Sequence, residues 1–225
     1  MTIAFRSFST FDNSTGALSS VPVDKPAGTA SGDVLIAFCM YYGQDAGPTP
    51  PSGWTEIDYA SEVTPKTNSG HRLHAWYRVA GGSEPSTYTW SMVNTDLYSA
   101  FAIVCYSGVN TSSPIDGTPS FQFNGTSASM SAASITTTVA NAMLVFLGCA
   151  GDSAAFSATP PSSFTERVDF YADWRSLYAA EKIQPSAGAT GSQIATINTS
   201  RINWGALVAL KPAPAASMLA LLGAG

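Results

Sequence analysis

Apolar positions along the chain gather into short runs that are bounded by turn residues. The runs Val34–Cys39, Ala100–Tyr106 and Leu144–Cys149 are almost continuously apolar, which is typical of strands that are buried on both faces. Between them, Trp54–Tyr59 and Arg72–Val79 alternate in polarity, the period of a half-exposed strand. No segment keeps a helical period of 3.6 residues for more than two turns. The pattern therefore predicts an all-β protein.

A proline-rich turn follows the first and the third of these runs. It reads Thr-Pro-Pro-Ser-Gly-Trp-Thr-Glu at 49–56 and Thr-Pro-Pro-Ser-Ser-Phe-Thr-Glu at 159–166. Three pairs of landmarks share one spacing of 110 positions: Cys39 with Cys149, Pro50 with Pro160, and Trp54 with Phe164. Such self-similarity indicates an internal duplication. We predict one duplicated β-sandwich domain over 1–211, with halves of about 1–110 and 111–211.

Each half supplies about five strands, separated by turn signals at the spacing expected of sandwiches. The first half adds a strand near Ile3–Phe8 and an edge segment at Val21–Val23, because proline cannot donate to a central ladder. In the second half Ser176–Ile183 takes the place of Arg72–Val79, with Leu177 matching Leu73 and Lys182 matching Arg78. The predicted architecture is a two-sheet antiparallel sandwich of jelly-roll type. Strand order cannot be derived from the pattern.

Composition narrows the class of protein. Of the 225 residues 45% are apolar, enough for a sizeable core, and only 11% are charged, against about 25% in typical soluble domains. The net charge is −5 and the ten basic residues are scattered, so nothing favours binding to nucleic acid or to an anionic membrane. Low charge with abundant Ser, Thr and Gly suits secreted β proteins and large assemblies.

The two ends of the sequence differ in character. Met1–Phe8 lacks the apolar core of a signal peptide and no stretch is long enough to span a bilayer, so we expect synthesis in the cytoplasm. Pro212–Ala216 has the composition of a stiff linker. A tail with four larger apolar residues follows: Met218, Leu219, Leu221 and Leu222. It is either a disordered terminus or an arm that docks on a neighbouring subunit, and we favour the arm because exposed leucines lower solubility.

Carboxylates and histidines raise the possibility of an enzyme. Glu56, Asp58 and Glu62 lie on one strand-like segment, as in some sandwich glycosidases. The outer two are about 20 Å apart on an extended strand, whereas glycosidase pairs need about 5–9.5 Å. His71 and His74 fall on opposite faces of a strand, which argues against a shared metal. We expect no catalytic residue, metal or cofactor, and we interpret all three cysteines as buried thiols.

Aromatic side chains offer a second kind of site, because their flat faces suit the apolar faces of sugars. Trp54 matches Phe164 in the other half, which favours a core position for both. Trp76 and Trp174 lie among charged residues and are the candidates for a ligand platform.

Several turn motifs, taken in order, suggest a family. They are Gly32-Asp33-Val34-Leu35, the Pro-Pro-Ser-Gly-Trp-Thr turn, Ser83-Glu84-Pro85-Ser86-Thr87-Tyr88-Thr89, Tyr106-Ser107-Gly108-Val109 and Pro114-Ile115-Asp116. Over residues 32–210 the pattern resembles the β-sandwich modules of tailed-bacteriophage virion proteins and related bacterial surface proteins. The matching positions are scaffold, so no functional residue is carried over.

The resemblance implies a non-enzymatic structural protein that binds other virion proteins or copies of itself. The leading hypothesis is a capsid decoration or cement protein, for which the resemblance suggests a trimer. The alternative is a module that binds carbohydrate or a host receptor on a tail fibre or surface appendage. A hydrolase using Glu56 and Asp58 is the weakest hypothesis.

Overall fold

A computed structural model describes most of the chain, and every regular element in the described part is a strand. The described residues are 2–13, 18–43, 47–62, 70–96, 99–151, 155–172 and 174–215. The first half contains β1 (Ala4–Asn13), β2 (Leu18–Asp24), β3 (Val34–Gly43), β4 (Thr55–Ser61), β5 (Gly70–Val79), β6 (Thr87–Asp96) and β7 (Ser99–Ser107). The second half contains β8 (Ser120–Ala132), β9 (Thr136–Thr137), β10 (Ala142–Gly151), β11 (Ala158–Thr159), β12 (Thr165–Ala172), β13 (Arg175–Gln184), β14 (Gly188–Ala189) and β15 (Gln193–Leu210).

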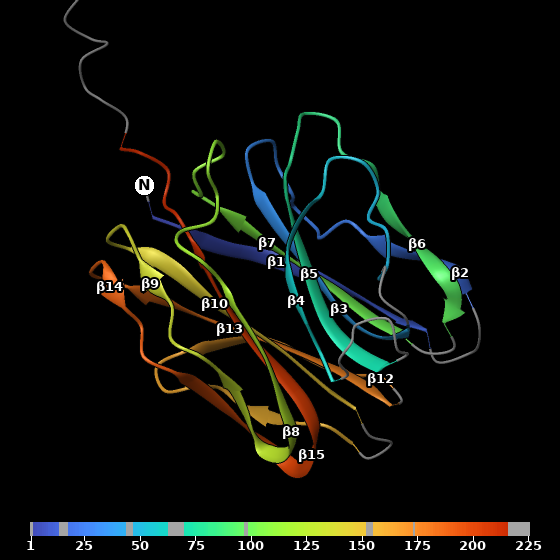
Figure 1. The fold of residues 1–225 in the computed structure, drawn as a ribbon. Helices are drawn as coiled ribbons and strands as arrows, with labels where there is room; N and C mark the ends of the chain where they lie inside the picture. The colour runs from blue at the N-terminus through green and yellow to red at the C-terminus, as the bar shows by residue number, and fades with distance from the viewer. Residues whose placement is uncertain are drawn as a thin grey trace, which may run out of the picture.

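The strands of the first half pair in a nested order. β1 pairs with β7, β2 with β6 and β3 with β5, all antiparallel, around β4 at the tip. The main sheet has the order β1, β7, β3, β5, β4, while β2 and β6 form a separate ribbon (Figure 1). Nested pairing of this kind is a long hairpin rolled on itself, which is the jelly-roll arrangement.

The second half repeats this order. In its main sheet β8, β15, β10, β13 and β12 lie side by side, at the places of β1, β7, β3, β5 and β4. The two halves differ in one respect. The second half has two long strands, β8 and β15, where the first half has two shorter strands in place of each: β1 and β2 in place of β8, and β6 and β7 in place of β15. The predicted all-β sandwich of jelly-roll type, built from an internal duplication, is therefore confirmed. The domain boundaries at 110 and 211 stay a prediction.

The two main sheets pack face to face over one apolar core. Val34 and Met143 hold the same place in their ladders, and both lie in this core, as do Val104 and Val208. β1 contacts β12 at one margin of the sandwich, and β4 contacts β8 at the other. Since β8 is the counterpart of β1 and β12 of β4, the two margins are the same contact made twice. The halves are thus related by an approximate twofold axis, as in an isologous dimer.

The register corrects one of the landmarks that revealed the duplication. Cys39 lies on the outer side of its sheet, in a cluster with β2 and β6, whereas Cys149 lies in the central core. With Val34 matching Met143, the counterpart of Cys39 is Gly148, so the cysteine match is wrong by one position. The match resumes after the proline-rich turn, where Glu56 and Glu166 each precede a β-bulge. A difference of one residue between the two intervening loops accounts for the slip.

The register of the next strands agrees with the prediction. Thr55 pairs with Tyr77, and Thr165 pairs with Glu181. Leu177 and Lys182 therefore do occupy the places of Leu73 and Arg78.

Each half also carries an outer apolar cluster, on the face of its main sheet away from the central core. In the first half β2 and β6 cover this face, with Val21, Val23 and Trp90 fully buried. In the second half the end of β8 and the beginning of β15 cover it, through Met130 and Ala195. The Val21–Val23 segment lies in β2 of the two-stranded β2–β6 sheet, where each strand is an edge, so its predicted edge position is confirmed.

Carboxylates in the turn motifs hold the scaffold together. Glu84 accepts hydrogen bonds from Arg78 Nε at 2.8 Å and Nη2 at 3.0 Å, from Gly81 N at 2.6 Å and from the Tyr88 hydroxyl at 2.7 Å. Burial of the Glu84 carboxyl opposes its ionisation, but these donors outweigh that effect and hold its pKa below the ordinary value of 4.5.

The Glu84 cluster predicts a component of acid sensitivity. Because the pKa is lowered on folding, the stabilisation is complete above pH 4.5 and is lost as the pH falls through the folded-state value. Melting temperature measured against pH should therefore fall more steeply below pH 4.5 in the wild type than in Glu84→Gln, which cannot ionise. Equal slopes for the two proteins would show that Glu84 does not contribute.

Candidate functional site

The strongest candidate for a partner-binding end is the place where the chain leaves the sandwich. Met218, Leu219, Leu221 and Leu222 lie outside the described residues. The path leading to them is described as far as Ala215 and is anchored. Lys211 N donates to Pro114 O, Asn110 N to Lys211 O, and Ala213 N to Gly108 O, each at 2.8 Å. The segment 211–213 is therefore part of the fold, and the tail begins beyond it.

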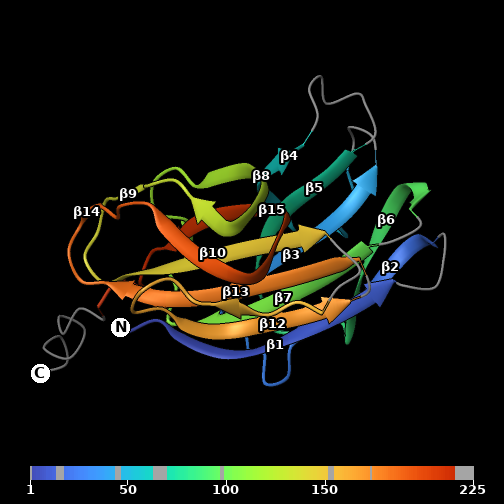
Figure 2. The ribbon, with the colours of Figure 1, turned by 90° about the horizontal axis from the view of Figure 1, so that it is seen from below.

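A cavity of about 700 Å³ opens beside this segment. Its walls are the beginning of β1, the turn before β3, the loop after β7, and Ala213 with Pro214. β1 begins and β15 ends at this same end of the molecule, at the left in Figure 2. The exit path of the tail thus forms one wall of an open hollow.

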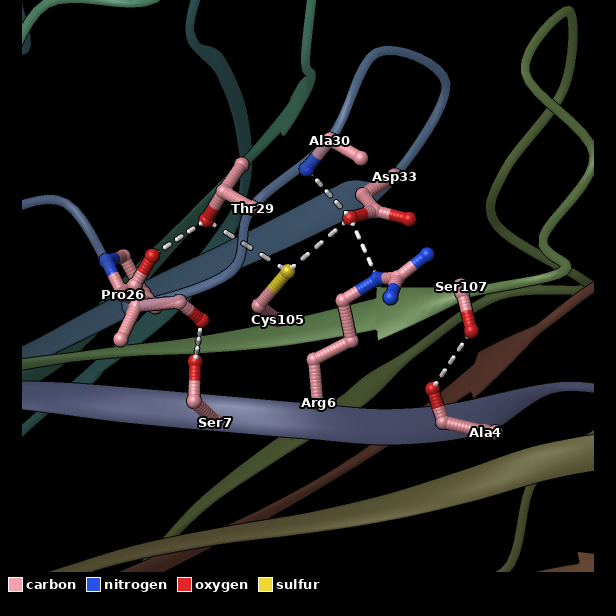
Figure 3. Close-up of polar contacts among 10 residues, drawn as sticks. Ala4, Arg6, Ser7, Pro26, Thr29, Ala30, Asp33, Cys105 and Ser107 are labelled. Carbon is pink, nitrogen blue, oxygen red and sulfur yellow. Dashed lines mark hydrogen bonds and ion pairs between the residues drawn. The ribbon is translucent and has the colours of Figure 1, made fainter.

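An ion pair lines the hollow (Figure 3). Arg6 Nε lies 2.6 Å from Asp33 Oδ2, and Ala30 N donates to the same oxygen at 2.8 Å. The Asp33 side chain is 4% exposed and that of Arg6 is 40% exposed. The Arg6 side chain therefore faces the cavity, while the Asp33 side chain is buried and hydrogen-bonded to the backbone of the turn before β3.

Cys105 lies behind this pair without being a nucleophile. Its sulfur is 3.7 Å from both Thr29 Oγ1 and Asp33 Oδ2. Burial, followed by the neighbouring Asp33 carboxylate, raises the pKa of the Cys105 thiol to about 12. The reactive form of cysteine is the thiolate, so the raised pKa makes the Cys105 thiol a poor nucleophile near pH 7.

The carboxylates considered for hydrolysis are not brought together. Glu56 Oε2 lies 3.3 Å from His74 Nε2, and Asp58 accepts from the backbone N–H of Tyr59 at 2.8 Å. A bulge at Ile57 separates the two residues along β4. Burial, followed by the charge of Arg72, lowers the pKa of His74 to about 3, which keeps its imidazole neutral near pH 7.

The two tryptophans of the expected ligand platform have different environments. Trp76 is 1% exposed and stacks on His74 with ring centroids 4.1 Å apart. Its faces are therefore closed to a sugar ring. Trp174 is 52% exposed and directly precedes β13. Sequence reasoning could not separate them, because charged neighbours along the chain do not reveal which face of a strand a later ribbon covers.

The described part of the chain holds no cluster of metal-ligating side chains. Among these residues, no group of three or more His, Cys, Asp or Glu side chains lies close enough together to bind a metal ion. Cys39, Cys105 and Cys149 are buried thiols that form no disulfide. No helix in the same residues is long and apolar enough to cross a membrane.

Known proteins offer little to compare with this chain. No protein-family model matches the sequence, and no curated protein is detectably similar to it. Among solved structures, the crystal structure of the STIV MCP aligns with 9% identity and a TM-score of 0.29, over 100% of this chain and 99% of that one. A TM-score this low does not establish a shared fold, so nothing about that protein is carried over to this chain.

Proposed function

We propose that this chain is a non-enzymatic structural protein of a virus particle, most specifically a bacteriophage capsid decoration or cement protein. The observation that carries the proposal is the anchored exit of the apolar tail. Hydrogen bonds from Asn110, Lys211 and Ala213 hold the segment 211–213, which leads to the tail, against the sandwich. A tail delivered from a fixed point can reach a defined site on a neighbouring subunit, whether another copy or the capsid protein.

The energetics of such an arm are adequate. Burial of a Leu or Met side chain is worth about 1.5–3 kcal/mol, so four of them offset much of the cost of ordering the tail. The scaffold supports a structural role because its buried carboxylates stabilise the fold itself. They are Asp33, Glu84 and Asp116, and each accepts hydrogen bonds from groups of the same chain. The low charge of the chain, 11% of residues, limits repulsion between packed copies.

Removal of the tail alone should separate assembly from folding. Truncation after Ala215 leaves the hydrogen bonds of Lys211 and Ala213 intact, so the melting temperature should stay at the wild-type value. Self-association or capsid binding, measured by light scattering and by co-sedimentation with capsids that lack the protein, should fall at least about tenfold. A matched variant keeps the length and replaces Met218, Leu219, Leu221 and Leu222 with serine, and it should behave like the truncation. Undiminished assembly in both variants would contradict the arm.

The location on a particle is a separate matter with its own test. Mass spectrometry of particles purified from the host of this gene should find the chain at a stoichiometry set by capsid symmetry. Light scattering of the isolated protein should give the mass of a trimer if the suggested oligomer is right. Absence of the chain from purified particles would overturn the structural role.

A further inference from the structure

Trp174 occupies a position where the backbone favours glycine. Ala172 at the end of β12 pairs with Arg175 at the start of β13, so Trp174 lies in the two-residue connection between these strands. Two-residue hairpin connections prefer Asn-Gly or Asp-Gly, because they need positive φ. Trp174 has a φ of 70°, which is a genuine outlier for a bulky residue.

Trp174 also gains little from packing. Its side chain is 52% exposed, the largest exposure of any large apolar residue described, while the other four tryptophans are buried. An exposed indole in a strained backbone stabilises neither the turn nor the core. Strain kept at one exposed aromatic residue points to a ligand.

A small hollow lies beside the indole. His71, Gly151, Trp174, Arg175 and Ile202 line a volume of about 270 Å³. Packing leaves little room for a side chain at Gly151, because a Cβ there would lie 3.0 Å from Met40 Cε and 3.1 Å from Ile202 Cγ2. Sites for drug-sized ligands measure about 300–1,000 Å³, so this hollow suits a single ring.

The polar groups at the hollow suit hydroxyls. Glu62 Oε1 accepts from His71 Nδ1 at 2.8 Å and from His71 N at 2.6 Å. Burial, and then the charge of Arg175, lowers the pKa of His71, so its ring is neutral at pH 7. With Nδ1 donating to Glu62, Nε2 is left as an acceptor for a hydroxyl. Tyr42 packs edge-on against His71, with ring centroids 5.0 Å apart and 45% of its side chain exposed.

We propose that Trp174 and the hollow lined by His71, Gly151 and Ile202 form a binding site for one neutral hexopyranose unit of a glycan. The apolar face of the sugar stacks on the indole, and its hydroxyls meet the imidazole and guanidinium edges. The site lies at the strand ends opposite the exit of the tail, and it is independent of the structural role proposed above.

Binding can be tested on the isolated full-length chain. The probes are the methyl glycosides of glucose, galactose, mannose and N-acetylglucosamine. Saturation-transfer NMR reports contact with the sugar ring, and iodide quenching of tryptophan fluorescence reports protection of the one exposed indole. At least one glycoside should give a saturable signal and protect Trp174. A panel with no signal would overturn the site.

Trp174→Gly distinguishes binding from folding. Glycine relieves the positive φ, so the melting temperature should be unchanged or higher, while affinity should fall on the order of tenfold or more. Phe8→Ala, which removes an aromatic side chain of 46% exposure on β1, should leave affinity unchanged. Retained affinity in Trp174→Gly, or a lowered melting temperature, would overturn the proposal. Because these measurements need no particle, they can fail or succeed independently of the structural role.

Discussion

Gly205→Ala should lower the free energy of unfolding by about 3 kcal/mol, near the upper limit for overpacking a core. A Cβ at Gly205 would lie 2.3 Å from Ser131 O and 2.7 Å from Ser131 C. Both are backbone atoms of β8, so no side-chain rotation can relieve the overlap. At about 2–4 °C per kcal/mol for a domain of this size, the melting temperature should fall by about 6–12 °C.

The glycine is needed because the two halves cover their outer faces differently. Gly205 pairs with Gly148 across β15 and β10, and a Cβ at Gly148 would meet Met130 Sδ at 2.0 Å. The two glycines form a depression in which the end of β8 lies. By register, the first half has Phe101 and Cys39 at these places, under the separate ribbon of β2 and β6.

A matched control is available for this substitution. A Cβ added at Gly82 would have nothing within 4 Å of it, and the φ of Gly82 is one that alanine adopts freely. Gly82→Ala should therefore leave the melting temperature within about 1–2 °C of the wild type. Chemical denaturation of both variants measures the difference. A Gly205→Ala protein as stable as Gly82→Ala would mean that β8 does not lie against β15 as described.

The sequence predicts the main sheets well, because their strands carry strong apolar patterns. Val34–Cys39 and Ala100–Tyr106 are buried on both faces, so their composition alone marks them. The sequence does not predict β8, because Ser120–Ala132 contains mostly small polar residues and has a half-exposed pattern. Its place in the fold is fixed by pairing with β15 and by the space at Gly205, neither of which leaves a periodic signal.

The sites were less predictable than the strands. Trp76 and Trp174 have similar neighbours in sequence, yet a strand position buries one and a turn exposes the other. The sequence does not mark this turn, because a tryptophan stands at the position of positive φ where glycine is usual. The one-position slip between Cys39 and Cys149 has a related cause, since a loop of different length moves a whole strand by one residue and exchanges its faces.

Asp116→Ala is the second substitution with a large expected effect. Asp116 lies in the connection between the halves and is fully buried. Its carboxylate accepts from Thr138 N at 2.9 Å, from Val139 N at 3.3 Å and from the Thr138 hydroxyl. Alanine would leave two backbone N–H groups without an acceptor, at about 1–3 kcal/mol each, so the free energy of unfolding should fall by about 3 kcal/mol.

The chemistry of Asp116 also predicts an order among variants. Asparagine keeps one acceptor oxygen and turns the other into a donor, which the Thr138 hydroxyl can accept by rotating. Asp116→Asn should therefore be intermediate between alanine and the wild type in urea unfolding. Asp58→Ala is the control, because Asp58 is exposed on β4 and accepts from the adjacent Tyr59 N–H, and it should cost less than about 1 kcal/mol.

A double-mutant cycle locates the effect of Asp116. If its carboxylate connects the segment between the halves to the turn before β10, then Thr138→Val and Asp116→Ala should be less costly together than the sum of the two single changes. Lys211 Nζ, 3.8 Å from Asp116 Oδ1, joins the same connection to the segment that leads to the tail. Loss of Asp116 should therefore weaken the anchoring of the segment that leads to the tail as well as the fold. Additive costs in the double-mutant cycle would mean that the hydrogen bonds with Thr138 do not stabilise this connection.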